Sequence, residues 1–322
     1  MIMPKVLIVA GIMPQKQARL RSIIAAFQTL SCETQTFNYR TWYFNHTKLT
    51  NRIINYLLVL ACKRYKPDIL YVIKGESLLP GIIKRVKKLG ITTINRTVEE
   101  PFGVHSPKML IKNIMEYDYL FSYDRWVVRK LSKERKHVYY LPCETATDFI
   151  QPLQEKKKYP VTFIGSYYPD REELLSHLLD FDLHIWGPGW DTVAKTSPLA
   201  KHIHYGESSY ESAYVRLLNE SIITVNLHHK QSVESANYRV FEAPATKTFL
   251  VTDYNKELPR LFVPGKELVT YRNITELRKL LTYYLKHEKE RQQIAENAYK
   301  RVLKEHTTLH RIRQVLETAK KK

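Results

Sequence analysis

Four short segments in the second half of the chain carry residues that could bind a diphosphate. They are FIGSYYPDR at 163–171, IWGPGW at 185–190, VNLHH at 225–229 and NYRVFE at 237–242. We interpret all four as lying just after strands of this half. The carboxyl ends of parallel strands are where ligand-binding loops gather, so the sequence predicts one site built from these segments.

The first segment combines a strand end with the start of a helix. Gly165 and Ser166 end the strand, and Asp170 with Glu173 has the spacing of a capping box that opens a helix. Free backbone amides at such a helix N-terminus attract anions, and Arg171 adds a cation on the first turn. We expect a diphosphate to bind here. The alternative is a strand–turn–helix corner with a surface arginine.

The last segment pairs a cation with a carboxylate. Arg239 precedes Glu242 by three residues, so in a helix both lie on one face. A cation for phosphate and a carboxylate for vicinal hydroxyls would together suit a nucleoside diphosphate sugar. Glu234 lies eight positions before Glu242, about two helical turns away. The alternative is an intrahelical ion pair between Arg239 and Glu242.

Two adjacent histidines follow the most apolar strand of this half. Neighbouring side chains on a strand point to opposite faces, so His228 and His229 cannot easily share one metal ion. We expect one of them to donate a hydrogen bond to a sugar or phosphate, with a structural histidine as the alternative. The glycines of IWGPGW fit a ligand loop or a plain turn equally well. No metal site is predicted.

The elements that must position these loops follow an alternating pattern. Apolar runs at 5–10, 68–73, 91–95 and 118–122 alternate with amphipathic stretches. This pattern predicts a parallel sheet with helices on both faces. The polar stretch QPLQEKKKY at 151–159 indicates a linker, after which the alternation resumes and ends in helices. We therefore predict an α/β fold of two Rossmann-like, doubly wound domains, residues 1–152 and 153–322, with C-terminal helices.

Composition limits the classes of function. The 322 residues carry a formal charge of +19, which attracts phosphorylated substrates, nucleic acid or acidic membranes. Three widely spaced cysteines support neither a disulfide framework nor a zinc ribbon and favour a reducing cytoplasm. No apolar run is long enough to span a bilayer. The charge and the 22 tyrosines motivate a rival, a basic nucleic-acid-binding protein, although no motif specific for nucleic acid is present.

The second half resembles the CgeB-type spore-maturation glycosyltransferases and the wider group-1 glycosyltransferases. The resemblance runs in order through the segments above, LFVPGKELVTYRN at 261–273 and EHTTLHRIRQVLE at 305–317. It implies a GT-B fold whose two domains face a cleft, with the acceptor on the first domain and the donor on the second. It also implies hexosyl transfer from a nucleotide sugar without a metal or other cofactor.

The same resemblance implies roles for single residues. Arg239 would contact the diphosphate, Glu242 the ribose hydroxyls, and Arg171 would replace a phosphate-binding lysine, while Glu234 takes the place of the first group-1 glutamate. The predicted donor-binding residues are Gly165, Ser166, Arg171, Trp186, Gly187, Asn226, His228, His229, Glu234, Asn237, Arg239 and Glu242.

The candidate general bases lie in the first half. Lys74, Gly75 and Glu76 follow one strand, and Glu99 and Glu100 follow the next. A base among Glu76, Glu99, Glu100 and His105 would activate the acceptor, with ordinary loop solvation as the alternative. The acceptor could be a polysaccharide, a lipid-linked molecule or a protein. We predict a cytoplasmic protein that contacts acidic membranes peripherally and binds no specific nucleic acid.

Overall fold

The computed structural model describes residues 3–12, 17–40, 48–98, 101–102, 108–205, 211–230 and 234–320. The chain forms two compact units. The first unit comprises Met1–Cys143, Gln231–Ser235 and Thr308–Lys322, and the second comprises Glu144–Lys230 and Ala236–Thr307. The boundary therefore lies at 143/144, where the sequence predicted 152/153, and the last helix belongs to the first unit.

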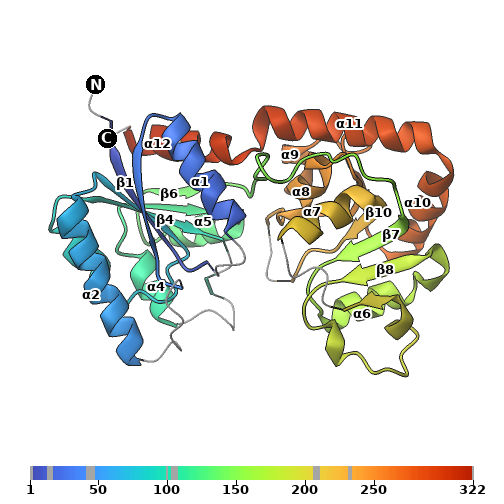
Figure 1. Ribbon diagram of the computed structural model, residues 1–322, viewed down its shortest axis with the longest axis horizontal. Coiled ribbons are helices and arrows are strands. Elements are labelled where there is room, and N and C mark those ends of the chain that lie inside the picture. Colours follow the sequence, from blue (N-terminus) through green and yellow to red (C-terminus); the bar gives the residue numbers. More distant parts are fainter. Residues whose placement is uncertain are drawn as a thin grey trace. The chain divides into compact units, whose positions relative to one another are not determined.

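A six-stranded parallel sheet forms the centre of the first unit (Figure 1). Its strand order is β2-β1-β3-β4-β5-β6. Parallel strands covered on both faces read as continuous apolar runs, which explains KVLIVA in β1. The strands are β1 (Lys5–Ala10), β2 (Glu33–Asn38), β3 (Ile69–Ile73), β4 (Thr92–Thr97), β5 (Tyr119–Ser122) and β6 (Val138–Tyr140).

Helices cover both faces of this sheet. Apolar residues of α1 (Ala18–Thr29) and α12 (Thr308–Lys320) pack on one face, and those of α2 (Lys48–Tyr65) and α3 (Ile82–Lys87) on the other. The stripe of Ile312, Val315 and Leu316 draws α12 into the first core, which is why the chain returns to this unit. The remaining helices are α4 (Lys108–Ile114) and α5 (Arg125–Leu131).

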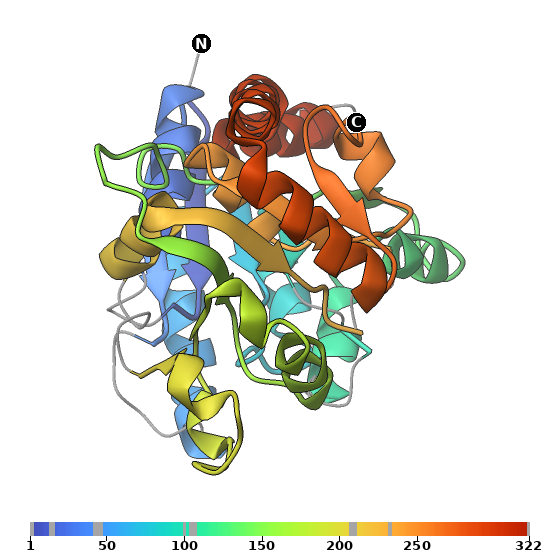
Figure 2. The ribbon, with the colours of Figure 1, turned by 90° about the vertical axis from the view of Figure 1, so that its right-hand side faces the viewer.

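The second unit repeats the architecture with the strand order β12-β11-β10-β7-β8-β9. Its core joins alternate residues of these strands to α6 and α10, and Figure 2 shows α10, in orange-red, lying across the sheet. The strands are β7 (Tyr159–Ile164), β8 (Leu183–Trp186), β9 (Ile203–His204), β10 (Ser221–Asn226), β11 (Phe249–Asp253) and β12 (Val269–Tyr271). The helices are α6 (Pro169–Ser176), α7 (Glu211–Glu220), α8 (Arg239–Ala245), α9 (Leu258–Leu261), α10 (Ile274–Lys286) and α11 (Glu288–Glu305). The predicted α/β class with two doubly wound, Rossmann-like units is confirmed.

The predicted capping box at Asp170 and Glu173 is wrong. Helix α6 begins one residue earlier, with Pro169 in its first turn and Tyr168 at the N-cap without a side-chain hydrogen bond. Proline suits the first helical position because its φ angle is already helical and it lacks an amide hydrogen there. Asp170 is therefore inside the first turn.

Candidate functional site

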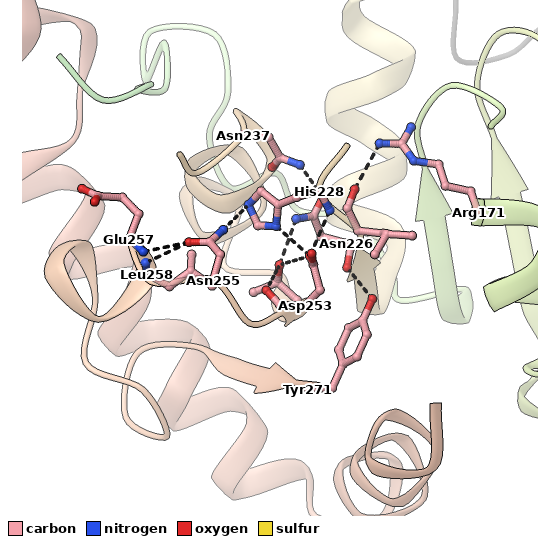
Figure 3. A network of polar contacts seen from close by, with 11 residues as sticks. Arg171, Asn226, His228, Asn237, Asp253, Asn255, Glu257, Leu258 and Tyr271 are labelled. Carbon is pink, nitrogen blue, oxygen red and sulfur yellow. Dashed lines mark hydrogen bonds and ion pairs between the residues drawn. The ribbon is translucent and has the colours of Figure 1, made fainter. Parts of the chain in front are cut away.

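The point where strand order reverses in the second sheet lies between β7 and β10. Ligands of doubly wound sheets bind at the carboxyl ends of the strands at such a switch point. Arg171 connects the two strand ends there. Its Nη2 donates to the Leu227 carbonyl (3.1 Å; Figure 3), and its Nη1 donates to the Ser166 carbonyl (2.7 Å). The predicted first and third segments thus meet at one place.

The guanidinium of Arg171 is partly removed from water. It lies over the rings of Phe163 and Tyr168, at 5.4 and 5.0 Å from their centres. Burial lowers the pKa of Arg171, and the positive charge of Arg239 lowers it further. Two like charges held close together in a partly desolvated place are stabilised by an anion.

Arg239, the first residue of α8, contacts the same loop. Its guanidinium donates to the Ile164 carbonyl and to the Tyr214 hydroxyl, and it lies over the Tyr214 ring. Arg239 and Arg171 therefore bind the carbonyls on either side of Gly165. Because those carbonyls already accept hydrogen bonds, the loop holds both cations at the strand end.

Glu242 is buried one turn further along α8. The sequence predicted that it shares a face with Arg239 if this segment is helical. Its Oε2 accepts a hydrogen bond from the Tyr214 hydroxyl at 2.6 Å. Tyr214 thus accepts from Arg239 and donates to Glu242, and this tyrosine on α7 connects the two predicted residues. Sequence reasoning missed Tyr214 because nothing in the helix around it marks which neighbour it contacts.

Both ring nitrogens of His228 have partners. The Nδ1 atom lies 2.6 Å from the Asp253 carboxylate, which also accepts the His228 amide, and Nε2 lies 3.2 Å from the Asn255 side-chain amide. Asn255 is fixed in turn by the amides of Glu257 and Leu258 (Figure 3). The ring of His229 contacts a different partner, Tyr168.

Asp253 and Asn255 were missed by sequence reasoning. The signal available was the end of the apolar run FLVTD, because Asp253 is the last residue of β11. The other segments were selected because ligand-binding residues gather at the carboxyl ends of parallel strands, which we call the strand-end rule. Polar residues at the position of Asp253 follow the same rule.

Asn226 ends β10 within a chain of amide contacts. Its Nδ2 donates to Thr252, its Oδ1 accepts from Asn237 at 3.0 Å, and its carbonyl accepts from the Tyr271 hydroxyl at 2.9 Å. Burial, together with the Asp253 carboxylate, raises the pKa of Tyr271 well above its usual range. Tyr271 is therefore a neutral donor, and the predicted Asn226 and Asn237 are held in fixed positions.

The predicted Gly165, Trp186 and Gly187 form the junction between β7 and β8. The Gly165 amide donates to the Trp186 carbonyl (2.8 Å), and its own carbonyl accepts from Trp190 Nε1 (2.8 Å). A Cβ on Gly187 would lie 2.0 Å from the Gly165 oxygen, and its φ angle is +143°. Only glycine fits there, because the two loops touch through their backbones.

Glu234 belongs to the first unit, whereas the other predicted donor-binding residues belong to the second unit. Its carboxylate binds both terminal nitrogens of Arg129, one at 2.7 Å, and its amide donates to Asp124. This carboxylate therefore takes part in a bidentate ion pair within the first unit.

Glu76 follows β3, next to the switch point of the first sheet between β1 and β3. Its carboxylate accepts hydrogen bonds from Tyr39 (2.7 Å) and Arg40 (3.1 Å). Burial, with the Glu76 charge, raises the pKa of Tyr39 well above its usual range, so the phenol stays a donor. The other candidate bases, Glu99, Glu100 and His105, lie outside the described residues.

The described residues form neither a membrane-spanning helix nor a cluster of metal ligands. None of the described helices is both long and apolar enough to cross a membrane. Within the same ranges, no three or more histidine, cysteine, aspartate or glutamate side chains are grouped so that they could hold a metal ion.

Residues 171–317 match the sequence model of a family described as glycosyl transferase-like. The matched region begins at Arg171 and includes Arg239 and Glu242. No curated protein matches the chain in sequence. The family match supports the predicted resemblance to the group-1 glycosyltransferase superfamily.

Solved structures share the fold at low sequence identity. Sucrose-phosphate synthase from Thermosynechococcus elongatus has a TM-score of 0.71 and 11% identity, covering 99% of both chains. HepE from Anabaena, in complex with UDP and glucose, has a TM-score of 0.70 and 12% identity, covering 98% of this chain and 99% of its own. A glycosyltransferase from Rickettsia africae has a TM-score of 0.70 and 13% identity over 98% and 97%. The predicted GT-B fold is thus confirmed.

Proposed function

We propose that the chain is a glycosyltransferase that moves a hexose from a nucleoside diphosphate sugar to an acceptor. The observation that carries the proposal is the pair of arginines at the β7/β10 switch point, bound to the carbonyls on either side of Gly165. When a glycosidic bond to a diphosphate breaks, negative charge grows on the leaving nucleotide. Fixed guanidinium groups stabilise that charge without reorganising, which lowers the barrier.

Donor recognition would extend from the arginines along α8. Glu242 is buried and Tyr214 holds its carboxylate in place, and a carboxylate accepts the hydrogen bonds that a pair of ribose hydroxyls donates. The complex of HepE with UDP and glucose supports the choice of a UDP sugar as the first donor to test. Glu234 and the histidines stay predicted donor contacts.

The first unit would bind the acceptor, a polysaccharide, a lipid-linked molecule or a protein. Tyr39 and Arg40 hold the Glu76 carboxylate in one orientation, as a general base requires. Glu99 and His105 remain predicted alternatives to Glu76. We also propose that the enzyme is a CgeB-type glycosyltransferase. It would be cytoplasmic and would contact the inner face of a membrane peripherally.

The test is turnover of a panel of nucleotide sugars in excess EDTA. We expect hydrolysis of one donor to persist in the chelator, because Arg171 and Arg239 supply the charge that a divalent ion would otherwise supply. Loss of all turnover in EDTA, restored by manganese, would contradict metal independence. No turnover of any donor, combined with tight, salt-dependent binding of nucleic acid, would instead support the rival function.

Glu242→Gln is expected to raise the KM for the donor about tenfold, the size of one hydrogen bond to a charged group. The kcat should stay near wild type, because ribose hydroxyls do not change during the reaction and the lost contact is uniform binding. Steady-state kinetics measure both constants, with the exposed Glu173→Gln on α6 as the matched control. An unchanged KM would remove Glu242 from the donor site.

A further inference from the structure

Helix α2 exposes a continuous apolar stripe. Leu49, Ile53, Tyr56 and Leu60 are 66%, 48%, 61% and 41% exposed. Their spacings of four, three and four residues place them on one line along the helix. The other exposed large apolar side chains among the described residues are distributed over separate elements. Contiguous exposed apolar surface marks an interaction site more often than single residues do.

The stripe is not needed to hold α2 on its own unit. A different face of the helix, carrying Ile54, Leu58, Val59 and Cys62, is buried against β1 and β3. Helix α2 is therefore apolar on two faces, and the described residues of the first unit cover one of them.

Cations border the stripe on both sides. At about 100° per residue, Arg52 and Lys63 lie along one edge and Arg64 along the other. Helix α2 contains no acidic residue. An apolar stripe between basic edges is the pattern of helices that lie in the surface of an anionic bilayer, and Tyr56 is a residue type favoured at that depth.

We propose that α2 is a docking surface for a membrane carrying anionic lipids. The net charge of +19 strengthens the attraction to such a surface. A second copy of the chain fits less well: two α2 helices packed along their stripes would place cationic edges against cationic edges, with no acidic residue to pair them. The membrane supplies the missing negative charge.

This proposal rests on α2 and not on the proposed glycosyl transfer. Binding to vesicles needs no donor, acceptor or turnover. Vesicle binding can therefore fail while the enzyme is active, and it can succeed where every donor fails.

Vesicle flotation at low salt tests the stripe. The full chain is expected to bind vesicles of phosphatidylcholine mixed with phosphatidylglycerol. It should not bind vesicles that contain only phosphatidylcholine. Ile53→Ser combined with Leu60→Ser should weaken binding about tenfold or more, since two side chains lose their apolar burial. Leu303→Ser is the matched control, because Leu303 on α11 is also 41% exposed.

The basic edges are tested in the same assay. Arg52→Gln combined with Lys63→Gln should weaken binding about 30-fold, from about 1 kcal/mol for each cation near an anionic surface. The control removes two charges from exposed lysines of the second unit, Lys279→Gln with Lys289→Gln. Equal losses in both pairs would show attraction by total charge and overturn the assignment to α2.

A probe on the stripe reports contact directly. The three native cysteines are buried, so Tyr56→Cys can be labelled selectively with a polarity-sensitive dye. Anionic vesicles should shift its emission to the blue, and a label at Leu303→Cys should not respond. An unshifted label at position 56, or sedimentation that shows a dimer broken by the stripe substitutions, would overturn the proposal.

Discussion

Arg239→Ala is expected to lower the kcat for the donor about a hundredfold or more, the scale of losing one fixed group that stabilises developing charge. The guanidinium lies at the strand end beside Arg171, where the leaving diphosphate would gain its charge. Since that charge grows only as the bond breaks, the lost interaction is stronger in the transition state than in the ground state. Steady-state kinetics with saturating donor measure the effect.

Two further variants separate charge from structure. Arg239 also binds the Ile164 carbonyl and Tyr214, so its removal could disturb the loop. Arg239→Lys keeps the charge and should recover part of the lost kcat, while Arg216→Ala removes an exposed arginine of α7 and should change nothing. Wild-type kinetics for Arg239→Ala, together with a small drop in melting temperature, would leave Arg239 and Glu242 with a structural role only.

The strand-end rule accounts for what the sequence predicted correctly. It selected the loops after β7 and β10, and the structure joins these loops through Arg171. The three-residue spacing of Arg239 and Glu242 separately predicted a shared face if their segment was helical, and α8 contains both residues. These are local features, set by a few neighbouring residues and by the alternation of strands and helices.

The features that sequence reasoning missed depend on contacts between distant segments. Tyr214 joins α7 to α8, and Asp253 reaches His228 across 25 residues of sequence. No local pattern states which strand lies beside which, so such partners appear only when the sheet order is known. The placement of α12 in the first unit has the same origin: its apolar stripe fits either core by pattern alone.

The positions of Arg171 and Arg239 depend on an uncharged contact between the backbones of Gly187 and Gly165. Gly187 touches the Gly165 carbonyl, and the carbonyls of Ile164 and Ser166 on either side bind Arg239 and Arg171. A shift of Gly165 would therefore move the binding positions of both guanidinium groups. In sequence, the glycines of IWGPGW fit either a turn or a ligand loop. In the structure, Gly187 packs against the loop whose carbonyls bind the two arginines of the proposed donor site.

Gly187→Ala is accordingly expected to destabilise the protein by about 3 kcal/mol or more, at or above the upper end of the usual range for single substitutions. The new Cβ would meet the Gly165 oxygen at 2.0 Å, and backbone cannot move aside as a flexible side chain can. Relief requires opening the junction, with loss of the hydrogen bonds from Gly165 to Trp186 and from Trp190 to Gly165. Denaturant unfolding measures the loss of stability.

The matched control is Gly265→Ala, a second glycine of the same unit with a positive φ angle of +75° and open space around it. That variant carries backbone strain without a clash, so we expect a loss of about 1 kcal/mol. In saturation-transfer measurements under conditions where both variants are folded, Gly187→Ala should also lose the donor signal, because both arginine positions move, and Gly265→Ala should keep it. Equal stability of the two variants, or an undiminished donor signal from Gly187→Ala, would show that the β7–β8 junction does not position the arginines.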